Sequence, residues 1–347
     1  METITKKPNL FGFDHEDLER LAREYREPPY RGRQIFRAVY EHRERDFHSV
    51  TGLARGFREA LDNRFSIRYP EVRQRFLSSD GSVRYLLELA DGDAVEAVYM
   101  PEERRATLCI SSQAGCAVAC RFCFTALMGL RRNLDAGEIL GQVWAILQDQ
   151  GISRGARLNV VFMGMGEPLL NYAEVMKAIR IMADPESFAI PLRRVTISTA
   201  GIIPGIRALA QERERPKLAV SLNASTGEQR TALMPINRKY PLDELIAACR
   251  EYALRPRERL TFEYVLLEDV NDSDVDAARV AALLHGIRAR VNVIPYNSGA
   301  ALPYRAPALE RVLAFQEALK RRGVPAFIRI SRGQDVNAAC GQLRLAV

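Results

Sequence analysis

The chain has 347 residues, 47% of them hydrophobic and 27% charged, so it is long enough for one large core or for a large and a small domain. Charged residues stand where a secretory signal needs an apolar run. No apolar stretch reaches the roughly 18 residues of a membrane span, so neither export nor a membrane location is expected, and a cytoplasmic location is. A net charge of +7 and a pI of about 9.2 suit a polyanionic partner such as RNA, although many basic proteins bind none.

The first part of the chain is predicted to be helical. Three segments carry apolar residues at three- and four-residue spacing: 14–25, 31–43 and 50–65. Six arginines lie between residues 26 and 45, interleaved with three aromatic residues: Tyr30, Phe36 and Tyr40. This stretch is either a solvated helix face with its rings turned inward or an RNA-contacting face, and the sequence does not choose. Residues 1–69 are predicted to form a helical region.

Residues 70–101 are predicted to form a β-hairpin extension that links this region to the rest of the chain. Asp80 and Gly81 form a turn signal between two extended runs, which predicts a hairpin within residues 72–89. A third extended run follows at residues 94–100.

From residue 105 onward, strands alternate with helices. Six strands are predicted, each followed by a helical pattern: 105–111, 157–163, 193–199, 216–222, 259–267 and 288–295. A late strand follows at residues 325–331. Such alternation predicts an α/β fold in which parallel strands carry helices on the outside. Periodicity does not choose between an open doubly wound sheet and a partial barrel, but in both the functional residues lie at the carboxyl ends of the strands.

Three of the six cysteines, Cys116, Cys120 and Cys123, fall in the loop after the first of these strands. Clustered cysteines in a reducing compartment are more often metal ligands or reactive thiols than disulfides. A structural zinc site wants four ligands, and all four histidines are remote in sequence. Three cysteines that only pack in the core would not need to be crowded on a loop. Three thiolates can instead hold a 4Fe–4S cluster and leave its fourth iron open to a substrate or cofactor.

Polar and glycine residues stand near the ends of the later strands. The turn at residues 163–168 contains Gly166, which lets backbone approach a ligand closely, and Glu167, which can accept from an ammonium group. Four short polar residues follow: Ser198, Ser221, Asn223 and Asn297. They are either partners for the ribose and carboxylate of a cofactor or helix N-caps, which are common at such positions.

The remaining cysteines divide into two kinds. Cys249 lies on a helical face, where we expect it to belong to the core. Cys109 lies in the first strand of the alternating region, seven residues before Cys116, and Cys340 follows the last strand near the C-terminus.

Several motifs together resemble one family. The C-x3-C-x2-C spacing with Phe122 before the last cysteine is similar to the radical S-adenosylmethionine (SAM) superfamily. The stretches "RATLCISSQAGCAVACRFC", "FMGMGEPLLNY", "VTISTAGIIPGI", "LMPINRKYPLDEL", "VNVIPYN" and "DVNAACGQL" resemble, in order, the RlmN/Cfr family of radical SAM RNA methyltransferases. The N-terminal "PPYRGRQIFRAVY" and the "GMGEP" turn are closer to the RlmN branch than to the Cfr branch.

This resemblance implies a partial (β/α)6 barrel over residues 102–335, with the C-terminal segment 336–347 carrying a methyl-accepting cysteine. The matching motifs of the helical region 1–69 imply an RNA-binding accessory domain. The resemblance implies methylation of carbon 2 of adenine in 23S ribosomal RNA, at the peptidyl transferase centre, and in tRNA next to the anticodon. It implies one 4Fe–4S cluster per chain, two SAM molecules consumed per methylation, and an electron donor such as flavodoxin. We expect a monomer with no membrane partner.

The resemblance also assigns roles to residues. Cys340 matches the cysteine that becomes S-methylated, Cys109 its disulfide partner, and Glu96 the proton acceptor. The cluster ligands are Cys116, Cys120 and Cys123. The implied SAM contacts are Gly166, Glu167, Ser198, Ser221, Leu222, Asn223 and Asn297.

Two residues depart from the family pattern. Phe124 stands where a small residue is frequent, and Asn337 replaces a frequent acidic residue near Cys340. Three other functions remain open at this point: a Cfr-type methylation at carbon 8, a non-catalytic iron–sulfur RNA-binding protein, and a zinc-stabilised basic domain.

Overall fold

A single ten-stranded sheet organises the chain in the computed structural model, which describes residues 7–252, 254–256, 258–298 and 302–345. The strand order is β1-β2-β3-β4-β7-β8-β9-β10-β11-β12. The strands in this sheet are β1 (Glu71–Leu77), β2 (Val83–Glu88), β3 (Ala94–Glu102), β4 (Arg105–Cys109), β7 (Leu158–Phe162), β8 (Val195–Thr199), β9 (Lys217–Ser221), β10 (Leu260–Leu266), β11 (Ala289–Pro295) and β12 (Ala326–Ile328). Strands β1 to β4 pair antiparallel, and β4 and β7 to β12 pair parallel.

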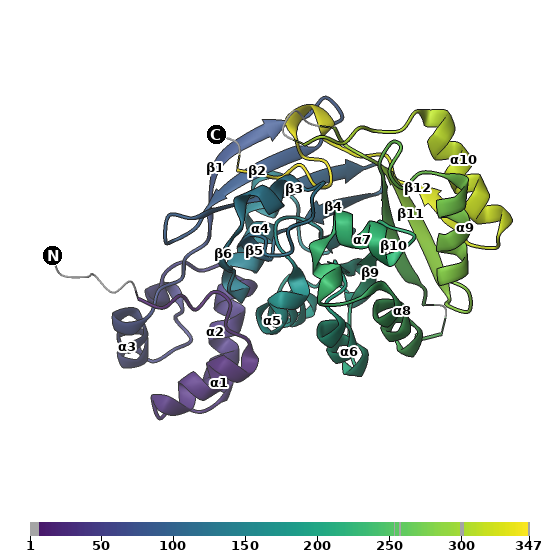
Figure 1. Ribbon diagram of the computed structural model, residues 1–347. Coiled ribbons are helices and arrows are strands. Elements are labelled where there is room, and N and C mark those ends of the chain that lie inside the picture. The colour runs from purple at the N-terminus through teal and green to yellow at the C-terminus, as the bar shows by residue number, and fades with distance from the viewer. Residues whose placement is uncertain (1–6, 253, 257, 299–301, 346–347) are drawn as a thin grey trace.

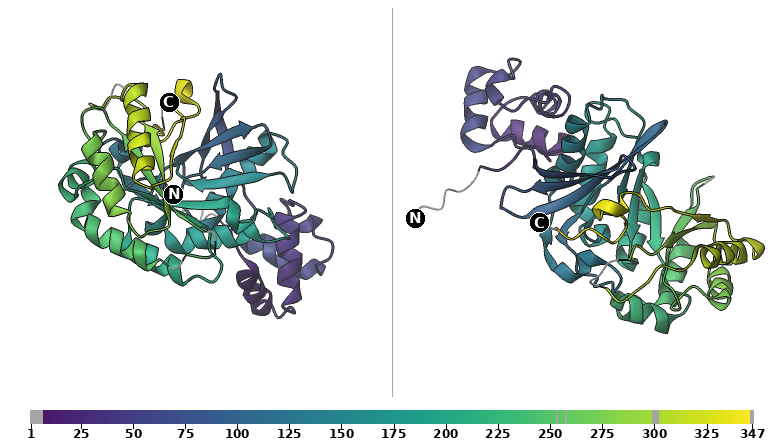
Figure 2. Two further views of the ribbon diagram at one scale, coloured as in Figure 1. Left: turned by 90° about the vertical axis from the view of Figure 1, so that its right-hand side faces the viewer. Right: turned by 90° about the horizontal axis from the view of Figure 1, so that it is seen from above.

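The helices of the parallel half form a row along the outer face of the curved sheet, as Figures 1 and 2 show for α5, α6, α8, α9 and α10. The α-helices after β4 are α4 (Ala136–Asp149), α5 (Tyr172–Ala183), α6 (Ile203–Gln211), α7 (Gly227–Leu233), α8 (Leu242–Glu251), α9 (Asp274–Leu283) and α10 (Leu309–Arg321). The strand order has two free edges, β1 and β12, so the sheet is not closed among the described residues. The α/β prediction is therefore confirmed, and the sheet has the form of a partial barrel.

The inner, concave face of the sheet is polar. In β7 the residues Leu158, Val160 and Phe162 are buried, whereas Asn159 and Val161 are half-buried. Successive strand residues point to opposite faces, and paired residues on neighbouring strands share a face. The register therefore places these residues on the concave face: Cys109, Thr196, Ser198, Lys217, Ser221, Glu263 and Arg290. A closed barrel fills this space with apolar side chains. In this protein, polar and titratable side chains line the space instead.

The three N-terminal helices, α1 (His15–Glu24), α2 (Tyr30–Tyr40) and α3 (Arg55–Arg64), form a separate small unit beside α4 and α5 (Figure 1). The rings of Phe36 and Tyr40 are buried, but Tyr30 is 55% exposed. The expectation that the aromatic rings turn inward therefore holds for two of three. Polar contacts fix this unit to the region after α5, among them the ion pair of Arg33 with Glu186 at 2.6 Å and the hydrogen bond between His15 and Asp184 at 3.1 Å.

Most of the arginines between residues 26 and 45 already have partners within the chain. Arg33 and Arg37 pair with Glu186 and Glu41, and Arg31 donates to the carbonyl of Gly52. The guanidinium groups of Arg43 and Arg45 lie over the rings of Trp144 and Tyr69. These contacts account for five of the six arginines without any bound RNA.

The sequence patterns located all ten strands of the sheet but missed the two-stranded ribbon of β5 (Gln113–Gly115) and β6 (Leu130–Asn133). These strands are too short to show a period. Cys249 lies in the core, as expected, with 1% of its surface exposed. Within the described part of the chain, no helix has the length and apolar character of a membrane span.

The N-terminal unit meets α4 through a close backbone contact as well as through side chains, which leads to a test. A methyl group at Gly137 would overlap the carbonyl oxygen of Phe11, whereas one at Gly56 in α3 would meet nothing within 4 Å. We expect Gly137→Ala to lower the free energy of unfolding by about 1–3 kcal/mol because the backbones must separate.

Gly56→Ala is the matched control, and it should raise the free energy of unfolding by roughly 0.5–1 kcal/mol. Urea titration of both full-length variants measures the two effects. Equal stability of the two variants would show that this close approach does not occur.

Candidate active site

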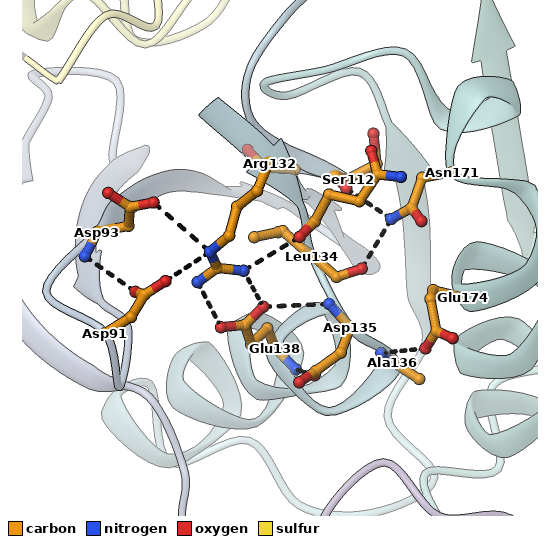
Figure 3. Close-up of polar contacts among 12 residues, drawn as sticks. Asp91, Asp93, Ser112, Arg132, Leu134, Asp135, Ala136, Glu138, Asn171 and Glu174 are labelled. Carbon is orange, nitrogen blue, oxygen red and sulfur yellow. Dashed lines mark hydrogen bonds and ion pairs between the residues drawn. The ribbon is translucent and has the colours of Figure 1, made fainter. Parts of the chain in front are cut away.

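The ribbon of β5 and β6 holds the two ends of the cysteine loop, and a polar network holds the ribbon (Figure 3). Arg132 of β6 donates to both carboxylate oxygens of Glu138 in α4, at 2.7 and 2.8 Å, and to Asp91 in the turn between β2 and β3, at 2.5 Å. Asn171 donates to the carbonyl oxygens of Ser112 and Leu134, which flank the ribbon, at 2.9 and 2.7 Å. Side chains from three separate elements therefore fix the base of the loop.

Gly115 and Gly129 allow the loop to close. The φ of Gly115 is +81°, a conformation that favours glycine, and a Cβ there would overlap the carbonyl oxygen of Gly129. The N–H of Cys116 donates to that same oxygen at 2.9 Å. This close contact between the two backbone segments therefore fixes the position of Cys116, the first cysteine of the loop.

The three clustered cysteines line one cavity, which the structure places at the carboxyl ends of the parallel strands. Burial raises the pKa of Cys116 to about 12 and raises those of Cys120 and Cys123 as well. Without a cation the three thiols are therefore neutral at physiological pH. A metal centre that binds thiolate would replace their protons and remove the cost of three buried charges. The donor set fits an iron–sulfur cluster with three cysteine ligands.

The same cavity collects most of the other residues singled out by the sequence. Its lining includes Gly166, Glu167, Ser198, Ser221, Asn223, Asn297 and Cys340. Leu222, Cys109 and Glu96 are not among the lining residues. Leu222 is fully buried, and its N–H donates to the carbonyl of Glu263, so only its backbone is near the site. Glu263 itself lines the cavity, although sequence reasoning passed over it because it lies inside a strand.

Glu167 is a buried carboxylate that faces the cavity. Burial raises its pKa to about 7, against the opposing effect of N–H groups that donate to it from Ala200 at 2.6 Å and Leu169 at 3.0 Å. Gly166, with φ +100°, lines the cavity, and packing also requires a glycine there, because a Cβ would lie 2.6 Å from Gln113. Its proposed contact with a ligand stays a prediction. Its small size serves packing against the ribbon.

The polar residues at the strand ends are not helix caps. The N-caps of α6 and α7 are Ile202 and Thr226. Asn223 and Asn297 have protein partners, since Asn223 accepts from the N–H of Val265 at 2.9 Å and Asn297 donates to the carbonyl of Cys340 at 3.3 Å.

The hydroxyl groups of Ser198 and Ser221 have no hydrogen-bond partner in the part of the chain that the structure describes. They are therefore available to a ligand in the cavity, whereas the two asparagines mainly order the walls.

Cys340 is accessible from the cavity and Cys109 is buried on the concave face of β4. Enclosure by the cavity walls raises the pKa of Cys340 to about 11, and the charge of Glu263 adds to this effect. Burial raises the pKa of Cys109, and the charge of Cys340 raises it further. The two thiols are therefore close enough to interact electrostatically. Both are free thiols in this structure, and the expected disulfide is not formed here.

Glu96 is fully buried on β3, two residues from Val98, the cross-strand partner of Cys109. Its carboxylate pairs with buried Arg84, whose guanidinium lies 3.9 Å from the centre of the Phe76 ring. The carboxylate also accepts the N–H of Arg344 at 3.0 Å. Burial raises the pKa of Glu96, while Arg84 opposes the rise. A role as proton acceptor stays a prediction, since this carboxylate is covered by the C-terminal segment.

The segment that carries Cys340 is fastened to the hairpin turn between β1 and β2. Asp335 accepts from the hydroxyl of Ser78 at 2.6 Å and from the N–H of Ser79 at 2.9 Å. Asp80 accepts the N–H of Gly333 at 3.0 Å. The extension predicted from the Asp80–Gly81 turn signal therefore holds the C-terminal segment in place.

The two departures from the family pattern have structural accounts. Phe124 is buried, and the guanidinium of Arg344 lies 5.2 Å from the centre of its ring, so the larger residue packs against the C-terminal segment. Asn337 has φ +52°, and asparagine tolerates this left-handed conformation better than most residues.

Comparison with known proteins agrees with this geometry. The model of the radical SAM superfamily matches residues 110–281, and that of the ribosomal RNA large subunit methyltransferase N-terminal domain matches residues 8–67. A probable dual-specificity RNA methyltransferase RlmN from Koribacter versatilis is 48% identical over 344 residues, covering 94% of this chain and 98% of the relative. The chain belongs to the RlmN family of radical SAM RNA methyltransferases.

Further relatives agree. A probable RlmN from Thermus thermophilus is 47% identical over 330 residues, covering 95% of this chain and 93% of the relative. A crystal structure of a radical SAM methyltransferase from Sphaerobacter thermophilus superposes with a TM-score of 0.90 at 42% identity, covering 97% of this chain and 99% of that one. This RlmN-family protein is a SAM-dependent methyltransferase that acts on RNA, and a 4Fe–4S cluster and SAM are its cofactors. The non-catalytic and zinc-stabilised alternatives are therefore set aside.

The ligand assignment can be tested with two cysteines, one that lines the cavity and one that lies in the core. Cys123→Ala removes one of three thiols that line the cavity, and we expect it to lose nearly all bound iron and all methylation. Cys249→Ala removes a core cysteine outside the cavity and should retain both. Iron content and visible absorbance after anaerobic reconstitution measure the outcome. A Cys123→Ala variant with a full cluster would contradict the assignment.

The environment of Cys340 predicts how it reacts. In the metal-free protein, alkylation of Cys340 should accelerate about tenfold per pH unit between pH 8 and 10, because the thiolate fraction grows below the raised pKa. Glu263→Gln should speed the reaction severalfold at pH 8, because removing the nearby negative charge lowers the pKa of Cys340.

Peptide mass spectrometry follows each site separately, and Cys249 should stay unmodified. Glu102→Gln, which removes a carboxylate outside the cavity lining, is the control for Glu263→Gln. If Glu263→Gln slowed the alkylation, the charge of Glu263 would not act on this thiol as described.

Proposed function

We propose that this enzyme methylates carbon 2 of adenine in 23S ribosomal RNA, at the peptidyl transferase centre, and in tRNA, at the adenine next to the anticodon. One observation carries the proposal: Cys340 opens into the cavity that the three clustered cysteines line. The backbone supports this arrangement, because the N–H of Phe124, beside Cys123, donates to the carbonyl of Gly341 at 2.8 Å. A methyl carrier is thereby held next to the candidate cluster.

The chemistry of the substrate explains why a cysteine carries the methyl group. Carbon 2 of adenine lies between two ring nitrogens and has no lone pair, so it cannot displace the methyl group of SAM. A thiolate can, and Cys340 is the accessible thiol of the cavity. When bound, the 4Fe–4S cluster held by Cys116, Cys120 and Cys123 and a second SAM supply the one-electron chemistry that makes the sulfur-bound methyl group reactive toward the ring. Two SAM molecules are consumed for each methyl group delivered.

Release of the product is assigned to residues next to the cavity. After the carbon of the methyl group has bonded to the ring, Cys340 is tied to the RNA. In the proposed release, the ring adduct gives up one electron, which the bound cluster would accept, and Glu96 takes the proton from carbon 2. The thiolate of Cys109 then attacks the sulfur of Cys340. The sulfur–carbon bond breaks, the freed carbon takes a proton, and the two cysteines end as a disulfide. Because the C-terminal segment covers Glu96, this step requires the N–H of Arg344 to leave the carboxylate.

The remaining residues of the cavity bind and orient the cofactor. The free hydroxyl groups of Ser198 and Ser221 and the carboxylate of Glu167 face a ligand with hydroxyl and ammonium groups, as SAM has. The backbone of Leu222 and the side chains of Asn223 and Asn297 complete the wall. We propose residues 1–69 as an RNA-binding accessory domain and residues 102–335 as the catalytic core of a monomer that receives electrons from a donor such as flavodoxin.

We propose carbon 2, and not carbon 8, as the methylated atom because the curated relatives carry the RlmN name and the chain matches the RlmN N-terminal domain. The deciding experiment is anaerobic turnover with labelled SAM on unmodified 23S ribosomal RNA and tRNA. Mass spectrometry of the nucleosides should find 2-methyladenosine. The appearance of 8-methyladenosine would show a Cfr-type reaction, and absence of label from both RNAs would contradict the proposal.

The role of Cys109 has a distinctive test. Because Cys109 acts only after the carbon bridge has formed, Cys109→Ala should still bind the cluster, methylate Cys340 and form the adduct. The variant should fail to release the RNA from this adduct. We expect a covalent protein–RNA species that survives a denaturing gel and that depends on SAM.

Cys340→Ala should give neither product nor crosslink, and the double variant should behave in the same way. If Cys109→Ala turned over normally, or was inactive with a full cluster and no slow-migrating species, Cys109 would have no part in release. In that case Cys109 would have only the structural role of a buried residue in β4.

A further inference from the structure

A second cavity lies at the opposite end of the sheet from the candidate active site. Its lining is Glu102, Glu103, Arg104, Arg105, Arg157, Asn159 and Arg194. These residues stand at the amino ends of β4, β7 and β8 or at the adjoining end of β3. The cavity of the clustered cysteines lies at the carboxyl ends of the parallel strands, so the two cavities are separate.

Positive charge gathers around this second cavity from five parallel strands. Nearly every strand begins with a basic residue on this side, and we call the set the basic cluster: Arg104, Arg105, Arg157, Arg193, Arg194, Lys217 and Arg290. Burial lowers the pKa of Lys217, and the positive charges of Arg290, Arg105 and Arg193 lower it further. The members are therefore close enough to repel one another.

Few of these charges are neutralised within the chain. Arg105 pairs with Glu102 at 2.8 Å, and Arg290 donates to the hydroxyl of Thr261 at 3.0 Å. The side chains of Arg104, Arg157, Arg193, Arg194 and Lys217 have no hydrogen bond or ion pair with another described residue. By contrast, five of the six arginines between residues 26 and 45 have partners in the chain. An array of like charges with few counter-charges is costly to the free protein, and an anion would relieve the repulsion.

The basic cluster and the active-site cavity share one face of one strand. Lys217 begins β9 and Ser221 ends it, and residues four apart in a strand point the same way. The two are about 13 Å apart at a rise of about 3.3 Å per residue. Ala219, which lies between them on this face, is fully buried, so an RNA strand with its adenine in the active-site cavity would reach the basic cluster over the surface of the protein and not along β9.

Resting on the proposed RNA substrate, we propose that the basic cluster binds backbone phosphates of the RNA strand beside the adenine that enters the active-site cavity. Arginine suits this role because its planar guanidinium binds phosphate oxygens in pairs. Phosphate contacts position a nucleic acid without reading its sequence. This property fits an enzyme whose relatives are named for dual specificity, since two different RNAs then need share only the geometry of the backbone near the target base.

The test compares two triple variants that lose the same net charge. One is Arg104→Gln with Arg157→Gln and Arg194→Gln, in the basic cluster. The matched control is Arg207→Gln with Arg279→Gln and Arg321→Gln, three exposed arginines of the outer helices α6, α9 and α10. The dissociation constant for an unmodified tRNA transcript and for a 23S ribosomal RNA fragment is measured over a range of salt concentrations. Full-length protein with its cluster is used throughout.

The cluster variant should bind both RNAs at least about tenfold more weakly at low salt, and its slope of log affinity against log salt should fall by about 2, at roughly 0.7 for each contact to a single strand. Arg→Lys at the same three positions should keep the slope, because the charges remain. The control triple variant should keep both affinity and slope. The cluster variant should still methylate Cys340 from SAM, which shows that its fold and cofactor site are intact.

Unchanged affinity and slope in the cluster variant would overturn the inference. Retained RNA binding with lost binding of an acidic electron-donor protein would overturn it in favour of a protein partner. Failure of the proposed function is distinguishable, because it would appear in the unaltered enzyme as RNA binding without methyladenosine. An equal loss of RNA binding in the control variant would show that total charge, and not the basic cluster, determines affinity.

Discussion

The hydrogen bond from the N–H of Phe124 to the carbonyl of Gly341 joins the two parts of the chain on which the chemistry depends. One part is the loop of three cysteines, fixed at its base by Arg132 and Asn171 (Figure 3). The other is the segment with Cys340, fixed by the hairpin turn at Ser78 and Asp80. If either anchor moved, Cys340 and the clustered thiols would no longer face one cavity. The antiparallel extension, which continues the sheet beyond the parallel strands, thus also holds the C-terminal segment in place.

Glu96 shows how this arrangement couples positions that are distant in the sequence. Its carboxylate binds Arg84 on the neighbouring strand and the backbone of Arg344 at the other end of the chain. The proposed proton acceptor therefore also fastens the segment that contains Cys340. Movement of that segment toward a substrate would uncover the carboxylate. The two events would occur together without any further signal.

Much of the fold could be predicted because its strands and helices are long enough to show their periods. The alternation from residue 105 onward gave the parallel strands, and the Asp80–Gly81 turn gave the hairpin. The ribbon of β5 and β6 could not be predicted, since strands of three and four residues carry no periodic signal. The spacing of Cys116, Cys120 and Cys123 pointed to one site because ligands close in sequence must be close in space.

Other parts of the site have no such local signal. Glu263 lies within an ordinary strand pattern, and only the register of the sheet turns it toward the cavity. The covering of Glu96 by Arg344 is a contact between residues 248 positions apart, which no local pattern reveals. The basic residues that begin the strands were visible in the sequence, but each alone is a common way to start a strand. Only the parallel topology brings them to one edge.

The fastening of the C-terminal segment also has a consequence for how the enzyme is made. The hydrogen bond between Ser78 and Asp335 joins residues that are 257 positions apart. At about 5–20 residues per second, a ribosome delivers Asp335 roughly 10–50 s after Ser78. For most of that interval the hairpin and the cysteine loop have been synthesised, whereas Cys340 has not. The core of a nascent chain can therefore begin to fold before the thiol that, in the proposed mechanism, becomes bonded to RNA has been added.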